Sequence, residues 1–272
     1  MRNSKTNELV LTGLFTAIII IMAFTPLGYI PLVVINATII HIPVILGSLF
    51  CGPKKGAFLG FVFGFTSCLK ATIVGGTLSS FVFSPVLAAS LVGTSGIFKS
   101  LFIAFVPRIL VGVIPYFVYI GIKEVLASEK KNLWGTVLNV LMSVFLAFGV
   151  YAFLGKMSES LSQAAALGIG IAVGAVVFIV VEAVFIRKST QVIPFVYAGV
   201  AGAMTNTLLV MGSIFVLYKD AYADAIGVAG NAVLGVITGV ISFNGVIEAI
   251  VAAIIVYLVG LVLNTIKPIA AK

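Results

Sequence analysis

The segment Val246–Ile266, VIEAIVAAIIVYLVGLVLNTI, determines the fold class of this chain. It contains a single charged residue, Glu248, near its beginning. A helix needs about 20 consecutive, mostly apolar residues to cross the hydrocarbon core of a bilayer. The segment meets this requirement, so it predicts a transmembrane helix.

Similar apolar stretches recur along most of the chain. Of its 272 residues, 61% are hydrophobic and only 9% are charged, and the mean hydropathy is +1.28. A soluble domain has roughly 25% charged residues, so that class is excluded. The composition also excludes a disordered chain and a disulfide-stapled scaffold, and the long uncharged runs exclude an outer-membrane barrel. We therefore expect an all-α polytopic membrane protein.

About eight segments are predicted to span the membrane. Two further uncharged stretches, residues 80–98 and 225–243, are rich in Gly, Ser and Thr and are expected to form apolar loops or short interfacial helices on the outer face. With both termini cytoplasmic, this topology places most Lys and Arg residues on the inner side, as the positive-inside rule requires. The predicted spans are residues 9–26, 38–51, 56–69, 101–122, 134–154, 164–185, 195–218 and 246–266.

Polar side chains inside the predicted spans are the candidate functional residues. A charge near the centre of a membrane helix costs at least about 2.5–3.5 kcal/mol, so such groups normally face the interior of the bundle. Several of them fall toward the outer ends of their spans and are expected to converge there. By contrast, Glu182 lies one turn from Arg187 and is expected to reach toward the membrane interface. The candidate substrate-binding residues are Asn36, His41, Arg108, Asn206, Asn244 and Glu248.

Two roles are open for Arg108 at this point. Its planar guanidinium group could bind a carboxylate or phosphate of the substrate. It could equally form an internal ion pair with Glu248 that holds two helices together. His41 is as compatible with a satisfied interior histidine as with a ligand contact.

No enzymatic chemistry and no cofactor are predicted. The stretch Gly93-Thr94-Ser95-Gly96 resembles the serine motif of rhomboid-type intramembrane proteases, but that motif requires a histidine on a later helix and His41 precedes it. No cluster has metal-ligand spacing, and the nucleotide-binding loop of P-loop ATPases is absent. If the protein drives uphill transport, the energy must therefore come from a partner or an ion gradient. Nucleic acid is not an expected partner, because the basic residues lie in short loops.

In order along the chain, several motifs resemble those of the substrate-binding S components of energy-coupling factor (ECF) vitamin transporters. The resemblance covers residues 6–123 and 192–268. The segments that carry it are residues 11–24, 36–45 (NATIIHIPVI), 52–57 (GPKKGA) with Gly60 and Gly64, 106–112 (VPRILVG), 205–207 (TNT) and 244–249 (NGVIEA).

The resemblance implies a membrane binding subunit that captures a water-soluble vitamin with high affinity. Its implied partners are the vitamin, membrane lipid, a transmembrane coupling subunit and two ATPase subunits. In that family the first helix meets the coupling subunit through small residues four positions apart, here Gly13 and Ala17. The last two motifs, residues 205–207 and 244–249, are most similar to those of pantothenate-type S components. Pyridoxine, hydroxymethylpyrimidine and other vitamins remain open as alternative substrates.

Family members typically have six helices, which implies an insertion in this chain. Residues 1–123 would hold the first four core helices, residues 124–190 an inserted helical pair, and residues 191–272 the last two core helices. Together they would form a single membrane domain. The alternative function is a self-sufficient, ion-coupled secondary transporter of a small carboxylate-bearing molecule.

Overall fold

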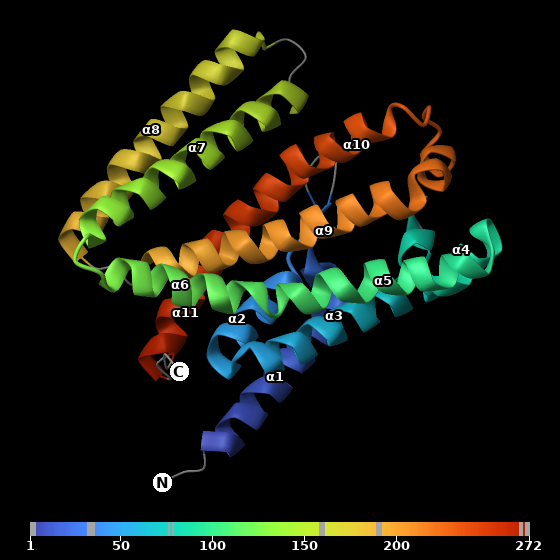
Figure 1. The fold of residues 1–272 in the computed structure, drawn as a ribbon, viewed down its shortest axis with the longest axis horizontal. Helices are drawn as coiled ribbons and strands as arrows, with labels where there is room; N and C mark the ends of the chain where they lie inside the picture. The colour runs from blue at the N-terminus through green and yellow to red at the C-terminus, as the bar shows by residue number, and fades with distance from the viewer. Residues whose placement is uncertain are drawn as a thin grey trace.

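The computed structural model describes residues 4–31, 36–75, 77, 79–157, 161–188, 192–266 and 269. Within these ranges the regular secondary structure is helical apart from one short antiparallel hairpin (Figure 1), formed by β1 (Tyr29–Pro31) and β2 (Asn36–Thr38). A π-helical turn, Ile241–Gly245, joins the last two helices. The α-helices are α1 (Ser4–Phe24), α2 (His41–Cys51), α3 (Pro53–Ile73), α4 (Pro85–Val92), α5 (Thr94–Val111), α6 (Ile114–Ala127), α7 (Lys131–Met157), α8 (Gln163–Lys188), α9 (Val192–Ile226), α10 (Val233–Val240) and α11 (Val246–Ile266).

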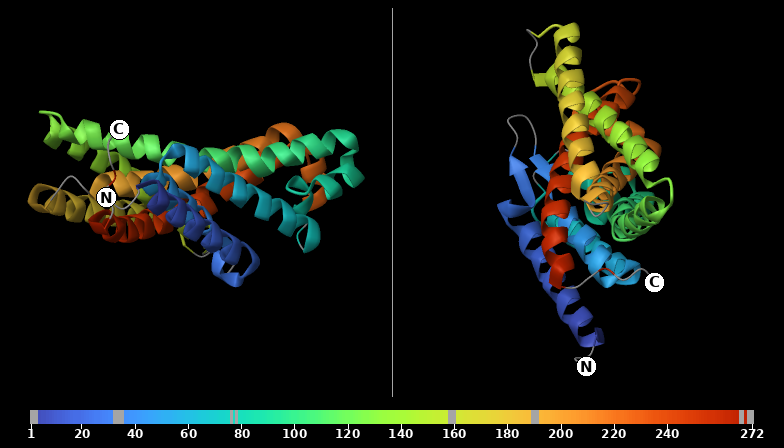
Figure 2. Two further views of the ribbon diagram at one scale, coloured as in Figure 1. Left: turned by 90° about the horizontal axis from the view of Figure 1, so that it is seen from below. Right: turned by 90° about the vertical axis from the view of Figure 1, so that its left-hand side faces the viewer.

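The predicted all-α polytopic membrane fold is confirmed. Seven stretches of the described chain are long and apolar enough to cross a membrane. They are Thr6–Phe24, Pro53–Ile73, Thr94–Ala127, Lys131–Gly155, Gln163–Ala183, Val192–Ile226 and Val233–Ile266. The beginning of α1 and the end of α11 lie at the same end of the molecule in both figures of the fold (Figures 1 and 2).

The predicted span over residues 38–51 is wrong in length. Thr38 belongs to β2, and α2 begins only at His41 and has 11 residues. At 1.5 Å per residue such a helix reaches roughly half the thickness of the hydrocarbon core. Almost all of α2 is buried, so this short helix is surrounded by protein and needs no full membrane crossing.

The two stretches predicted as apolar loops or short interfacial helices are largely helical. Ser84 caps α4 by accepting a hydrogen bond from the Leu87 N–H, and Pro85 occupies the first turn. In residues 225–243, α10 continues through the π-helical turn into α11. The Gly, Ser and Thr content was misleading, because a hydroxyl in a membrane helix can bond to its own backbone, as Thr238 does with the Leu234 carbonyl.

Glycines on one face of α3 explain how closely α3 and α5 pack. A methyl group at Gly56 would overlap the Gly112 carbonyl oxygen, and one at Gly60 would overlap the Arg108 carbonyl oxygen. Ser48 of α2 donates a hydrogen bond of 2.6 Å to the same Gly112 carbonyl. The short side chains of this region thereby bring the backbone of α5 against α2 and α3.

Helices α7 and α8 lie side by side and diverge from the other helices toward one end (Figures 1 and 2). Glu182 of α8 accepts hydrogen bonds from Thr136 (2.7 Å) and Asn139 (2.8 Å) of α7. The sequence-based expectation, which placed Glu182 at the membrane interface, did not include these two partners. The Glu182 carboxylate bonds to two polar groups of the neighbouring helix, where a lipid-facing position would leave all three unsatisfied.

Candidate functional site

A buried carboxylate, Glu248, joins three separate parts of the fold. It lies in the first turn of α11, and its side chain is 6% exposed. One of its oxygens, Oε1, accepts a 2.8 Å hydrogen bond from the Thr38 N–H of β2. The other, Oε2, accepts a 3.1 Å bond from the Thr207 hydroxyl of α9. We call Glu248, Thr38 and Thr207 the polar cluster.

The local backbone places Glu248 where a carboxylate is tolerated. Because α11 follows the π-helical turn without a break, no free helix end lies beside Glu248, and its carboxylate is stabilised by the two donors of the polar cluster. The preceding π-helical turn contains Gly245, where an added methyl group would lie 3.0 Å from the Thr207 side chain. The absence of a side chain at Gly245 therefore lets α9 come close enough for the Thr207 bond.

Arg108 reaches the same region from α5. It follows Pro107, which has no N–H, so the Ile103 carbonyl one turn earlier loses its usual helical partner. Arg108 Nη1 donates a 2.9 Å hydrogen bond to that carbonyl. The guanidinium carbon lies 5.4 Å from the Phe63 ring centroid and 4.8 Å from that of Phe83.

The guanidinium group of Arg108 also interacts with residues outside its own helix. It is 6% exposed, and it attracts the Glu248 carboxylate electrostatically. Its carbon lies over two aromatic rings, and a planar guanidinium group is suited to bind a planar, negatively charged group. Arg108 therefore links the polar cluster with the aromatic side chains of α3 and of the segment before α4.

Two other predicted residues are buried with unsatisfied polar atoms. His41, the first residue of α2, is fully buried, and neither ring nitrogen bonds to any other described residue. Asn206 of α9 is 8% exposed, and its Oδ1 likewise has no hydrogen-bond partner in the described part of the chain. Buried polar atoms without partners are costly, so both residues are suited to contact a polar ligand.

For the other two predicted binding residues, Asn244 and Asn36, the described part of the structure gives a position but no side-chain hydrogen bond. Asn244 is half-buried in the π-helical turn, one helical turn before Glu248. The backbone of Asn36 pairs with Pro31 in the hairpin, while its side chain lies outside the described part of the structure.

The structure also adds partners that sequence reasoning missed. The Thr38 contribution is a backbone N–H, which carries no sequence signal, and Phe63 and Phe83 look like ordinary apolar residues. Thr207 had a visible signal, since it stands beside Asn206, but the sequence alone does not say which side chain faces Glu248.

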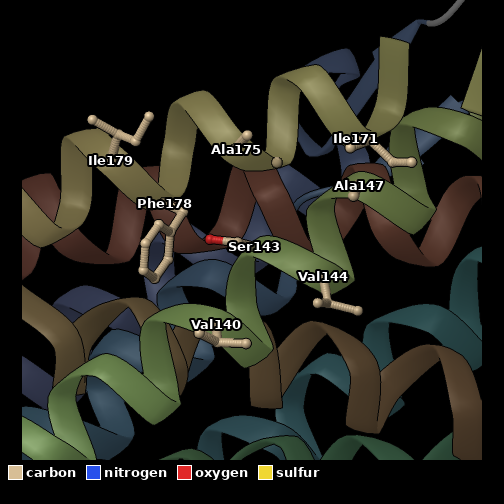
Figure 3. A pocket seen from close by; sticks show the side chains of 9 residues that line it. Val140, Ser143, Val144, Ala147, Ile171, Ala175, Phe178 and Ile179 are labelled. Atoms are coloured by element: carbon tan, nitrogen blue, oxygen red, sulfur yellow. The ribbon is translucent and has the colours of Figure 1, made fainter. Parts of the chain in front are cut away.

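Two hollows are described outside the polar cluster. A groove of about 410 Å³ lies between α7 and α8 and is lined almost entirely by apolar side chains, with Ser143 as its one hydroxyl (Figure 3). A second hollow of about 530 Å³ lies between the α7–α8 pair and α10, and its lining mixes polar with apolar side chains. We call this second hollow the α10 cleft.

One face of α1 is open. Gly13 and Ala17 are exposed, and a methyl group added at Gly13 would meet nothing within 4 Å. Apolar neighbours on this helix are also exposed, among them Val10 and Ile21. Beneath this face α1 is held to α3 by an ion pair of 2.9 Å between Glu8 and Lys55.

Comparison with known families identifies the class of protein. Residues 7–186 match the model of the family described as "ECF transporter, substrate-specific component". The chain belongs to this family. It is therefore a substrate-specific component of an ECF transporter and a multi-pass protein of the cell membrane, and its family is one of transporters and not of enzymes.

Similar substrate-specific components carry a substrate in their names. The "Pantothenic acid transporter PanT" of Lactococcus lactis subsp. cremoris is 42% identical over 161 residues, which is 55% of this chain and 78% of that protein. The "Pantothenate transporter PanT" of Leuconostoc mesenteroides subsp. mesenteroides is 27% identical over 277 residues, covering 100% of this chain and 98% of that protein. The second alignment runs through α7 and α8, so a relative is similar to this chain along its whole length.

Proposed function

We propose that this chain is the subunit that binds pantothenate for uptake by an ECF transporter. The observation that carries the proposal is the 42% identity with a protein named as a pantothenic acid transporter, supported by the full-length similarity to a second one. The transport energy would come from two partner ATPase subunits that act through a transmembrane coupling subunit.

The site chemistry supports a ligand of this kind. Pantothenate carries a carboxylate, an amide and two hydroxyl groups. In our proposal Arg108 binds the carboxylate, while His41 and Asn206 use their unsatisfied atoms to bond to the amide and hydroxyl groups. A carboxylate accepts up to about four hydrogen bonds, so Glu248 can also accept one from a ligand hydroxyl. Asn36 and Asn244 complete the proposed site.

The same proposal includes the topology. The end of the molecule that carries the β1–β2 hairpin and α4 would face the outside, and both termini would be cytoplasmic. Residues 124–190, which contain α7 and α8, would be a pair added to a core formed by residues 1–123 and 191–272. In support, Glu182, Thr136 and Asn139 connect α7 and α8 to each other.

The first prediction concerns ligand binding and energy coupling. We expect the purified chain in detergent to bind pantothenate without partners, measured by titration calorimetry and by thermal stabilisation, because a ligand bound to the folded state raises its stability. We expect concentrative uptake in proteoliposomes only when the coupling subunit and both ATPases are present with ATP. Uphill uptake by the chain alone, dependent on an ion gradient, would instead indicate a secondary transporter.

The second prediction separates the two roles of Arg108. We expect Arg108→Lys to remain folded, because an ammonium group can still bond to the Ile103 carbonyl. We expect its pantothenate affinity to fall about 10–100-fold, because lysine lacks the planar pair of donors that binds a carboxylate. Arg108→Ala should lose binding as well and also destabilise the fold, since it leaves that carbonyl unpaired. Wild-type affinity in Arg108→Lys would show that the residue is structural, and melting temperatures of both variants provide the control for folding.

A further inference from the structure

The α10 cleft has the lining of a binding site for an uncharged polar molecule. Its volume of about 530 Å³ falls within the range of about 300–1,000 Å³ that is typical of small-molecule sites. Hydroxyl and amide groups from four elements line it: Tyr151 of α7, Gln163 of α8, Thr238 of α10 and Ser242 of the π-helical turn. None of the described residues that line it is an acid, a lysine, an arginine or a histidine.

Most of these polar groups are available to a ligand. Thr238 bonds to carbonyls of its own helix. In contrast, the side chains of Tyr151, Gln163 and Ser242 form no hydrogen bond with another residue in the part of the chain that the structure describes. Apolar side chains such as Phe148 and Leu161 alternate with them around the cleft, so it offers both hydrogen bonds and apolar contact.

Glycines in two of its helices keep the cleft open. Gly155 of α7 and Gly235 of α10 both line it, and a methyl group added at either would meet nothing within 4 Å. Glycine inside a helix costs about 1 kcal/mol relative to alanine. Close packing does not explain these two glycines, and the absence of side chains there leaves space in the cleft.

The cleft is separate from the polar cluster but adjacent to it. Both lie along the π-helical turn, whose Ser242 lines the cleft and whose Gly245 packs against Thr207. Single π-helical turns inside membrane or soluble helices frequently occur at functional sites. The two sites also differ in charge, because Arg108 and Glu248 belong to the polar cluster, while the described lining of the cleft is uncharged.

We propose that the α10 cleft is a second binding site. It takes a neutral molecule whose hydroxyl and amide groups resemble those of the dihydroxy-amide half of pantothenate. This choice of ligand rests on the proposed function. The tyrosine, serine and glutamine side chains pair with the hydroxyl and amide groups, and Phe148 and Leu161 contact the geminal methyl groups. The cleft discriminates against the carboxylate, because none of the described residues that line it carries a positive charge.

The test uses pantothenol, in which an uncharged alcohol replaces the carboxylate of pantothenate. We expect calorimetry to show that the wild-type chain in detergent binds pantothenol, and that Gly235→Leu weakens this binding at least about 10-fold by filling the cleft. Gly235→Leu should fold, because its position is open and leucine favours a helix more than glycine does. Gln163→Ala should also weaken pantothenol binding, which tests the hydrogen bonds separately from the space.

The matched control is Gly168→Leu. Gly168 is an exposed glycine of α8 with nothing within 4 Å of an added methyl group, and it does not line the cleft. We expect it to bind pantothenol as the wild type does. Pantothenate affinity, which reports on the polar cluster, should change less than about 3-fold in Gly235→Leu.

The outcomes distinguish this inference from the proposed function. A wild-type chain that binds pantothenate but not pantothenol, or a Gly235→Leu variant with wild-type pantothenol affinity, overturns the second site alone. Equal losses of affinity for both molecules in Gly235→Leu also contradict a separate site. A wild-type chain that binds pantothenol in the cleft but does not bind pantothenate overturns the proposed function and leaves the cleft as a binding site.

Discussion

Replacement of Glu248 by alanine is expected to abolish pantothenate binding and to destabilise the protein by about 2–4 kcal/mol. The change removes the acceptor of both the Thr38 N–H and the Thr207 hydroxyl. An unsatisfied buried donor costs about 1–3 kcal/mol. Loss of binding should follow because β2, which leads into α2 and His41, is no longer fastened to α11. Calorimetric titration and thermal unfolding in detergent measure the two effects.

Glu248→Gln is the matched control for this variant. It keeps the size of the side chain and a carbonyl oxygen that can accept the Thr38 bond, and its amide can donate to the Thr207 oxygen. We expect it to lose less than about 1 kcal/mol of stability, since both hydrogen bonds can be kept. If Glu248→Ala were as stable as the wild type and bound pantothenate normally, the polar cluster would have no role in the site.

The second large effect is expected on α1, where bulky residues should block transport without affecting binding. In our proposal Gly13 and Ala17 form the surface that meets the coupling subunit, because small residues let two membrane helices approach closely. The double variant Gly13→Leu with Ala17→Leu should lose more than about 90% of ATP-driven uptake. Its pantothenate affinity should equal that of the wild type, because these positions are exposed and contact no part of the site.

Gly168→Leu serves as the control here too, since it adds a leucine to an exposed membrane helix elsewhere. It should leave both uptake and assembly unchanged. Co-purification with the coupling subunit measures assembly directly. Normal uptake and normal co-purification of the α1 double variant would exclude this face as the contact surface.

From the sequence it was possible to predict which charged residues are buried in the membrane protein, but not which groups they contact. The long uncharged runs indicated the membrane class correctly, because a helix of about 20 apolar residues matches the thickness of the hydrocarbon core. Buried charges such as Arg108 and Glu248 were visible for the same reason, since each needs a purpose inside a membrane. Their partners were not visible, because the Ile103 carbonyl and the Thr38 N–H belong to the backbone and look alike in every residue.

The errors in the predicted spans have a physical cause as well. Hydropathy shows where a helix is tolerated by lipid but does not show where protein surrounds it. The short helix α2 is buried by its neighbours and therefore need not be long. In residues 225–243, the Thr238 hydroxyl bonds to its own helix, so polar composition did not indicate a loop.

The bond between Thr38 and Glu248 joins residues 210 positions apart, and this separation affects how the protein is made. Chains emerge from the ribosome with the N-terminal part first, so the hairpin is synthesised long before the carboxylate that secures it. Every earlier helix can enter the membrane while Thr38 still lacks its acceptor. Substrate capture thus begins only when the last helix is in place, and a chain that is truncated before α11 is expected to insert without acquiring the ability to bind.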